Sequence, residues 1–320
     1  MGTCGKTDPA TEITNEIIAL LQTGTMPWRR PWKIAGGGMP LRSTGDAYQG
    51  INAFLLGIRA AIHGYSSPYW LTFQQAKKLD AHVRKGEKSS LVVYYGTARK
   101  RRESADGDAG GEGEGQEAAV DSDGYRFLKS YRVFNAAQIE GLEAEWHPEP
   151  EAMPKAGAEP IPELQEFFEA IDIETRFGGN QACYIADLDL VRMPEFERFD
   201  SANLFYATWA HELSHATKSP GRLNRSFGAS SFGNEPYSKE EICVEFAAVL
   251  LGQRLGFTGD HIENHAAYIG SWLKILGGDR RFLFTAAAHA QRAVDYLVAA
   301  SESGRKAQDP LTSDRVTEAA

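Results

Sequence analysis

The chain has 320 residues, of which 42% are hydrophobic and 24% are charged, which excludes a wholly disordered protein and a low-complexity fibre. Because single cores stop growing at roughly 250–300 residues, this length predicts two domains. No segment approaches the roughly 18 uninterrupted apolar residues of a membrane span, and the N-terminus lacks an apolar signal core. Three scattered cysteines exclude a disulfide framework. We therefore expect a protein of the reducing cytoplasm with no membrane partner.

The net charge of −9 is distributed unevenly along the chain. Residues 1–102 contain 15 Lys and Arg against 6 Asp and Glu, whereas residues 103–124 contain 8 acidic residues and no basic one. Residues 125–320 contain 19 basic and 29 acidic residues. Because attraction to phosphate depends on local charge, the basic front of the chain favours a nucleic-acid partner at that end.

The first part of the chain predicts a small domain over residues 1–145 that mixes helices and strands. Apolar spacing predicts three helices, over residues 9–23, 50–63 and 72–82. Two runs of β-branched and aromatic residues, 91–95 and 125–135, predict a pair of strands. The segment between them, about 99–124, is rich in Gly, Ala, Glu and Asp, and we expect it to be a flexible acidic insertion in a hairpin.

The second part predicts a mostly helical domain over residues 162–303, which makes the whole chain an α+β protein. A Pro-rich linker over residues 146–161 precedes this domain, and a disordered tail over residues 304–320 follows it. Residues 175–194 predict a hairpin. Composition and stop signals predict helices over residues 162–172, 200–217, 238–255, 260–276 and 279–301.

The sharpest motif lies in residues 211–215, near the end of a predicted helix. A spacing of four places His211 and His215 one above the other on one helical face, where two imidazoles can bind one zinc ion. Glu212 then lies beside a zinc-bound water whose pKa falls to about 7, and it can take the proton of that water and pass it to a leaving amine. This pattern is typical of a zincin metalloprotease with Glu212 as general base, and another divalent metal could occupy the same ligands.

A third metal ligand is required, and zincins of this type take it from a later helix. Glu241 and Glu245 share one face of the next acidic helix, so one can ligate while the other holds a ligating histidine through its second ring nitrogen. We predict that Glu241 is the ligand and that Glu245 is the supporting residue. Glu240 is expected to face solvent, although a shift of one residue in the helix phase would exchange these roles.

Three further histidines are not predicted to bind metal. His261 and His265 have the same spacing of four but carry their glutamate at another offset, so we expect polar caps or surface groups. His289 lies in an alanine-rich helix and is expected to be a packed or hydrogen-bonded core histidine.

The basic front of the chain also interleaves cations with aromatic rings. Single-stranded nucleic acid is bound by this chemistry, because bases stack on exposed rings at about 1–3 kcal/mol each while Lys and Arg contact phosphates. The alternative is that these rings belong to the core of a small domain, which is the usual place of aromatic residues. The candidate DNA contacts are Trp28, Arg29, Arg30, Trp32, Trp70, Arg84, Lys85, Lys88 and Tyr94.

Long motifs in both halves resemble the ArdC-type antirestriction proteins of conjugative plasmids and related mobile elements. The segments PWRRPW, YQGINAFLL, YWLTFQQAKKLDAHVRKGEKS and YRVFNAAQ look like the N-terminal domain of that family, which also occurs in plasmid primases and is associated with single-stranded DNA. The segments AHELSHATKSPGRL and YSKEEICVEFAA look like its C-terminal metallopeptidase domain. The resemblance covers almost the whole chain, although the acidic insertion looks longer than the family pattern requires.

The resemblance implies a protein that accompanies or protects incoming single-stranded DNA and helps a mobile element escape host restriction. It also implies a metal set of His211, His215 and a glutamate of residues 240–241, with Glu212 as general base. Two hypotheses are open: a zinc-dependent peptidase that acts on an unidentified host protein, or a DNA-binding protective protein whose metal site is structural. A secreted metalloprotease toxin is a weaker third reading, because a signal segment is missing.

Overall fold

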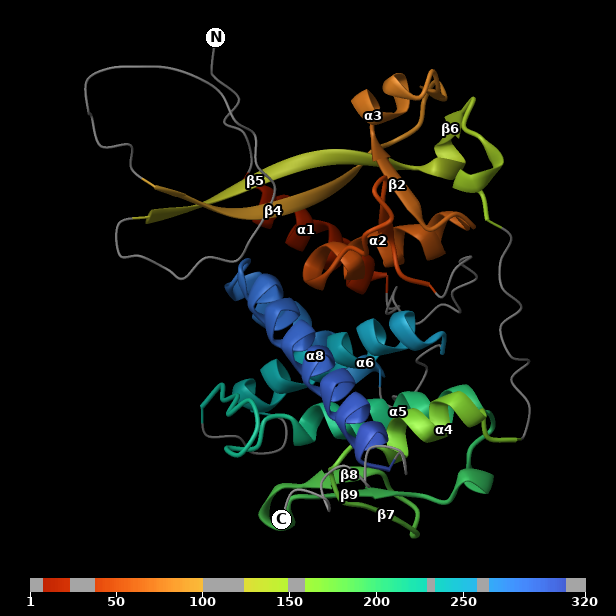
Figure 1. Cartoon of the computed structure of the whole chain (residues 1–320). Coiled ribbons are helices and arrows are strands. Elements are labelled where there is room, and N and C mark those ends of the chain that lie inside the picture. The colour runs from red at the N-terminus through yellow and green to blue at the C-terminus, as the bar shows by residue number, and fades with distance from the viewer. Residues whose placement is uncertain are drawn as a thin grey trace.

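The computed structural model describes residues 8–23, 38–99, 124–148, 159–228, 234–257 and 265–308. A sheet with its helices lies at one end of the molecule, long helices lie in the middle, and a small second sheet lies at the other end (Figure 1). This arrangement confirms the predicted α+β class. The acidic segment, residues 100–123, and most of the Pro-rich segment, residues 149–158, lie outside the described residues.

The N-terminal half contains a mixed sheet in the order β1-β2-β5-β4, in which only β1 and β2 are parallel. Its strands are β1 (Leu41–Arg42), β2 (Tyr69–Thr72), β4 (Ser90–Arg99) and β5 (Gly124–Asn135). Two helices, α1 (Pro9–Gln22) and α2 (Gly50–His63), lie beneath the sheet in Figure 1. Both agree with the predicted helices because local signals define them: Pro9 opens α1, and Gly64 ends α2 with a left-handed φ of 68°.

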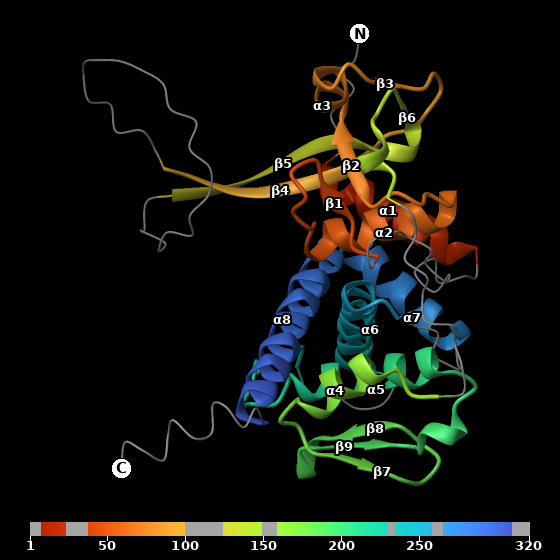
Figure 2. The ribbon, with the colours of Figure 1, turned by 45° about the vertical axis from the view of Figure 1, so that its right-hand side comes forward.

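Strands β4 and β5 form the predicted hairpin, and their antiparallel pairing runs from Ser90 opposite Val133 to Arg99 opposite Gly124. Asn52 of α2 forms two hydrogen bonds with the outer edge of β4. Its side-chain oxygen accepts the N–H of Val93, and its side-chain nitrogen donates to the carbonyl of Val93. The other end of the hairpin extends away from the body of the molecule (Figure 2). The hairpin is therefore anchored by α2 at its base and projects at its tip.

Helix α3 (Phe73–Lys78) is shorter than the helix predicted over residues 72–82. The helix ends early because Asp80 adopts a positive φ of 55° and the chain then enters β3 (His82–Val83). This short strand pairs with β6 (Ile139–Glu140), far along the sequence. The prediction of the last helical turn is wrong, because a non-local strand pairing replaces it.

The C-terminal half contains a three-stranded sheet in the order β7-β9-β8. Residues 175–194, predicted to be a hairpin, form three strands instead of two: β8 and β9 are antiparallel, and β7 pairs in parallel with β9. The strands are β7 (Thr175–Phe177), β8 (Cys183–Ile185) and β9 (Leu190–Met193). The helices are α4 (Pro162–Glu169), α5 (Ala202–Ala216), α6 (Glu235–Leu255), α7 (His265–Gly278) and α8 (Phe282–Gln308).

Helix α8 continues to Gln308, into the tail that was predicted to be disordered from residue 304. At this point the helix packs closely against the residue that follows α4. A Cβ added to Gly304 would overlap the carbonyl oxygen of Ala170. Only glycine permits such an approach between two backbones. The prediction of disorder is wrong for residues 304–308, and residues 309–320 lie outside the described residues.

The two halves of the chain share one hydrophobic core. Helix α1 packs against α7, and α2 packs against α6 and α8. The rings of Phe54 in α2 and Phe246 in α6 lie 3.9 Å apart between centroids, and Thr14 of α1 donates a hydrogen bond to the carbonyl of Arg280. The domain boundaries at residues 145 and 162 remain a prediction. Within the described ranges, no helix has both the length and the apolar character needed to cross a bilayer.

Candidate metal centre

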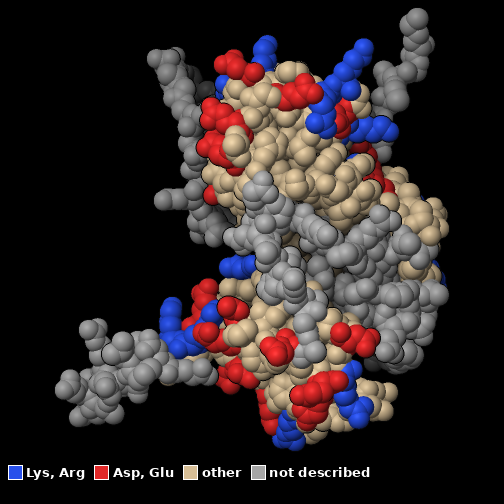
Figure 3. Space-filling model, turned by 90° about the vertical axis from the view of Figure 1, so that its right-hand side faces the viewer, with Lys and Arg blue, Asp and Glu red and all other residues tan. Residues whose placement is uncertain are grey.

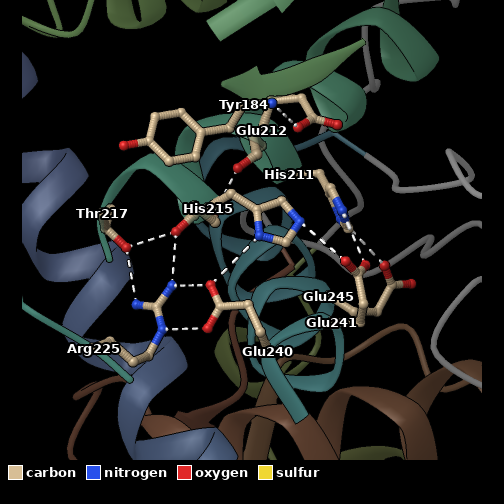
Figure 4. Close-up of polar contacts among 11 residues, drawn as sticks. Tyr184, His211, Glu212, His215, Thr217, Arg225, Glu240, Glu241 and Glu245 are labelled. Atoms are coloured by element: carbon tan, nitrogen blue, oxygen red, sulfur yellow. Dashed lines mark hydrogen bonds and ion pairs between the residues drawn. The ribbon is translucent and has the colours of Figure 1, made fainter. Parts of the chain in front are cut away.

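The metal motif lies at the C-terminal end of α5. This helix begins at Ser201, whose hydroxyl oxygen accepts the N–H of Leu204, and it is buried on almost every side. Because residues four apart lie on one face, His211 and His215 project together toward α6, with 4.9 Å between their ring centroids (Figure 4). The helix thus presents two imidazoles to one buried point.

Glu241 of α6 meets both imidazoles at this point. Its Oε2 lies 3.6 Å from His211 Nε2, and its Oε1 lies 3.4 Å from His215 Nε2. One candidate ligand atom from each residue lies within 4.8 Å of the other two. Such spacings suit a tetrahedral ion with bonds of about 2.0–2.2 Å, whose ligand atoms lie about 3.3–3.6 Å apart. The three predicted ligands are therefore brought together, and their donor set fits a divalent metal.

Each imidazole also has a carboxylate at its second ring nitrogen. Glu245 Oε2 lies 3.7 Å from His211 Nδ1, in the supporting position predicted for it, and Glu240 Oε1 lies 3.4 Å from His215 Nδ1. The prediction that Glu240 faces solvent is wrong, because it is only 6% exposed. Helix α6 is buried around most of its circumference at this level, and Arg225 supplies the cation that a buried carboxylate needs.

Glu212 follows His211 in sequence, but its carboxylate turns toward the small sheet. Its Oε2 accepts the backbone N–H of Tyr184 in β8 at 2.8 Å. Figure 4 shows this carboxylate pointing away from Glu240 and Glu241. Among the described strands β8 lies at the edge of its sheet, so Glu212 joins the end of α5 to that edge.

Burial and charge act in opposite directions on the ionisation of this cluster. Burial by itself would lower the pKa of both imidazoles, but hydrogen bonding to Glu241 and its neighbours raises the pKa of His211 to about 10, and the pKa of His215 is raised as well. Burial would raise the pKa of the glutamates, but Arg225 lowers the pKa of Glu240 to about 2, and the imidazolium groups lower that of Glu241. At neutral pH the metal-free cluster therefore consists of paired cations and anions.

We expect divalent-metal binding to release protons, because a metal requires neutral imidazoles. Near pH 8 His211 is protonated without metal, so at least one proton should leave, and the apparent affinity should rise about tenfold per pH unit for each proton released. The raised pKa stabilises the metal-free fold fully below its ordinary value of 6.5, and this contribution is lost as the pH rises toward 10. Calorimetric Zn²⁺ titrations in two buffers of different ionisation enthalpy count the protons; a count of zero contradicts the expectation.

The candidate DNA contacts fall into three groups. Four lie outside the described residues: Trp28, Arg29, Arg30 and Trp32. Trp70 lies on an inner strand of the N-terminal sheet, packs edge-on against Tyr65 and is only 1% exposed. A ring buried in this way cannot stack on a base, so the prediction that Trp70 contacts DNA is wrong.

The remaining candidate DNA contacts are exposed and lie in two parts of the N-terminal half. Arg84, Lys85 and Lys88 lie around β3, and Arg84 forms a 2.7 Å ion pair with Glu87. The end of the molecule that carries α3, β3 and β6 shows Lys and Arg side chains mixed with Asp and Glu (Figure 3). Tyr94, by contrast, stands on the projecting hairpin with 55% of its surface exposed.

The hairpin of β4 and β5 carries two further candidate DNA contacts, Lys129 and Tyr131, that are not among those predicted from the sequence. Lys129 of β5 lies opposite Tyr94, and Tyr131 lies two residues further along β5, so the three share one face of the hairpin. Tyr131 is 46% exposed. Alternation within the strand could have assigned Lys129 and Tyr131 to one face, but the strand register, which brings them beside Tyr94, is not readable across the long intervening segment.

Among the described residues, the candidate ligand group contains no histidine besides His211 and His215. His261 lies outside the described residues, and only the backbone of His265 is described. His289 packs its ring against Phe227 at 5.3 Å between centroids, which confirms that it is a packed histidine.

A helix with two imidazoles and an adjacent glutamate, joined by a carboxylate from the following helix, defines a zincin-like site. Residues 162–289 match the family model of a zincin-like metallopeptidase. Residues 7–134 match the model of the N-terminal domain of the anti-restriction factor ArdC. The chain belongs to the ArdC family of antirestriction proteins.

Similar proteins cover most of the chain. The crystal structure of antirestriction protein ArdC from plasmid R388 in its metal-free form has a TM-score of 0.75 and 39% identity, over 92% of this chain and 98% of that chain. Its Mn(II)-bound structure has a TM-score of 0.74 and 38% identity over the same shares. The uncharacterised protein y4eC of Sinorhizobium fredii is 35% identical over 94% of each chain. DNA primase TraC of Escherichia coli is 34% identical over 90% of this chain but only 27% of the primase.

Proposed function

We propose that this chain binds single-stranded DNA with its N-terminal half, cleaves a protein with its C-terminal half, and so protects the incoming DNA of a mobile element from host restriction. The observation that carries the peptidase half is the approach of Glu241 to the Nε2 atoms of both His211 and His215, beside Glu212. The related ArdC has a Mn(II)-bound structure, which supports a divalent ion as a ligand of this chain as well. Zn²⁺ suits the same ligands.

The roles of the residues follow from their positions. His211, His215 and Glu241 would hold the metal, which when bound supplies Lewis acidity toward a substrate carbonyl. Glu212 acts as general base: its carboxylate takes a proton from the attacking water and later gives it to the leaving amine. An extended substrate segment can pair with the outer side of β8 if it replaces the hydrogen bond that the Tyr184 N–H now donates to Glu212. The substrate is an unidentified host protein, which this protein meets in the cytoplasm.

A second candidate function is a protective DNA-binding protein whose metal site is structural. One observation favours it: the carboxylate of Glu212 already accepts the N–H of Tyr184, so it is engaged by the protein itself. The two candidates differ in whether Glu212 takes part in a reaction, and its replacement separates them.

The DNA half of the proposal rests on the hairpin of β4 and β5. Tyr94 and Tyr131 offer two exposed rings on one face, and Lys129 stands opposite Tyr94. Rings bind bases by stacking and lysines contact phosphates, with little dependence on sequence. The exposed Arg84, Lys85 and Lys88 remain proposed phosphate contacts around β3.

The variant Tyr94→Ala, Tyr131→Ala should weaken binding of single-stranded DNA by about 1–3 kcal/mol for each base that loses its stacking partner. Fluorescence anisotropy with a labelled oligonucleotide measures this loss. The matched control is Phe73→Ala, which removes an exposed ring from α3 and should leave the affinity unchanged. Equal affinity of the tyrosine variant and the wild type would remove the hairpin from the proposal.

The protective role is tested by transfer of an unmodified plasmid into a restricting host and into a host without restriction. Expression of the wild-type protein should raise the transfer frequency in the restricting host alone, and the double tyrosine variant should reduce this effect. A wild-type protein with no effect on transfer in the restricting host would contradict the proposed function.

A further inference from the structure

Arg225 lies beside the candidate metal centre, in the segment that follows α5, and none of the roles above uses it. Its side chain is 1% exposed. The guanidinium donates to both oxygens of Glu240, through Nε at 2.9 Å and Nη2 at 2.8 Å. Such a two-point contact fixes both the position and the plane of a carboxylate.

The remaining donors of Arg225 attach it to the end of α5. Nη1 donates to Thr217 Oγ1 at 3.0 Å, and Nη2 also donates to the carbonyl of Ser214 at 3.0 Å. Ser214 lies one residue before His215 in the sequence, and Thr217 lies two residues after it. Figure 4 shows the guanidinium between this end of α5 and the carboxylate of Glu240 on α6. The arginine therefore joins the helix that carries the imidazoles to the helix that carries the glutamates.

Two consecutive glutamates of α6 approach His215 from different sides. Glu240 Oε1 lies 3.4 Å from its Nδ1, and Glu241 Oε1 lies 3.4 Å from its Nε2. Both carboxylates are buried, so burial alone does not decide which of them ligates a metal. They differ in two ways: Glu241 approaches the Nε2 atoms of both histidines, and Arg225 engages both oxygens of Glu240.

We infer that Arg225 is a positioning residue of the metal site: it holds Glu240 at the Nδ1 of His215 and thereby leaves Glu241 as the carboxylate that ligates. This inference rests on the proposed metal site. With Glu240 Oε1 3.4 Å from Nδ1, the carboxylate is placed to accept the Nδ1–H when a metal is bound, which would leave the lone pair of Nε2 facing that metal. Without the arginine, Glu240 would be a buried anion with the metal as its nearest available cation, and it would turn toward that metal.

The test is a Mn²⁺ titration of the wild type, Arg225→Met, Glu240→Leu and the double variant. Each single variant should weaken Mn²⁺ binding by about 10–100-fold, the usual effect of removing a partner of a metal ligand. If Arg225 acts through Glu240, the double variant binds no more weakly than Glu240→Leu. The matched control is Arg222→Met: Arg222 also contacts both oxygens of a carboxylate, that of Asp189, through Nη1 at 2.6 Å and Nη2 at 2.9 Å, and its replacement should leave the affinity unchanged.

Two further measurements separate positioning from a general effect on the fold. Arg225→Lys keeps the buried charge but loses the two-point contact, so it should fold and still weaken Mn²⁺ binding. In protein saturated with Co²⁺, Arg225→Met should change the visible spectrum, because a second carboxylate joins the ion and alters its geometry. A merely structural role would leave the spectrum of the saturated protein unchanged.

The outcomes are distinct. Wild-type Mn²⁺ affinity in both Arg225 variants overturns the inference, as does an unaltered Co²⁺ spectrum or a double variant whose loss equals the sum of the single losses. If the wild type itself binds no Mn²⁺, the proposed metal site fails and the inference fails with it. If the wild type binds Mn²⁺ and the Arg225 variants bind it equally well, only the inference fails.

Discussion

Glu241→Ala should weaken divalent-metal binding by more than about 100-fold, because even the outer partners of metal ligands contribute about 10–100-fold. The variant removes the carboxylate that lies within 3.6 Å of the Nε2 atoms of both His211 and His215. Two imidazoles on one helix then remain as ligands, which is too few for a stable site. Calorimetry with Mn²⁺ and Zn²⁺ measures the loss.

Glu235→Ala is the matched control for this variant. Glu235 lies in the first turn of the same helix, where it is exposed and forms a 2.7 Å ion pair with Lys239. Its replacement should leave metal affinity unchanged. If Glu241→Ala bound metal like the wild type while Glu240→Ala did not, the assignment of the third ligand would be reversed.

Glu212→Gln should reduce hydrolysis of a protein substrate by about 10²–10⁴-fold, the usual contribution of a general base. Glutamine has almost the same shape and can still accept the N–H of Tyr184 through its side-chain oxygen, but it cannot take up a proton. Metal affinity and DNA affinity should therefore stay at the wild-type values. Release of fluorescent fragments from a labelled protein, with the metal-loaded enzyme, measures the change.

The control for the glutamine variant is Glu195→Gln, at an exposed position outside the metal centre, which should retain full activity. The same pair of variants is then tested in plasmid transfer to a restricting host. Protection that is lost with Glu212→Gln supports the peptidase. Full protection by that variant, together with unaltered metal binding, would support the structural metal site instead.

Several parts of this protein were predictable because their signals are local. Pro9 and Gly64 mark ends of α1 and α2, and the spacing of His211 and His215 guarantees a shared face as soon as the segment is helical. The β-branched and aromatic runs likewise predict the hairpin of β4 and β5. Each of these features depends on residues that are neighbours within one turn or one strand.

Packing between distant segments decided other features of the fold. Trp70 and Tyr94 are both aromatic residues in a basic region, but only their places in the sheet bury the first and expose the second. Helix α8 extends past its predicted end because Gly304 fits against Ala170, more than a hundred residues earlier in the chain. The residue types alone do not predict which aromatic ring is buried or where α8 ends.

The amino-acid sequence by itself determined that two histidines would face one point and that a nearby helix would offer three glutamates. Tertiary structure decided what each glutamate does: Glu241 meets both Nε2 atoms, while Arg225 engages Glu240 at the other side of His215. The physical reason is that helical periodicity sets which side chains share a face, whereas the partner of a buried charge comes from another segment of the folded chain.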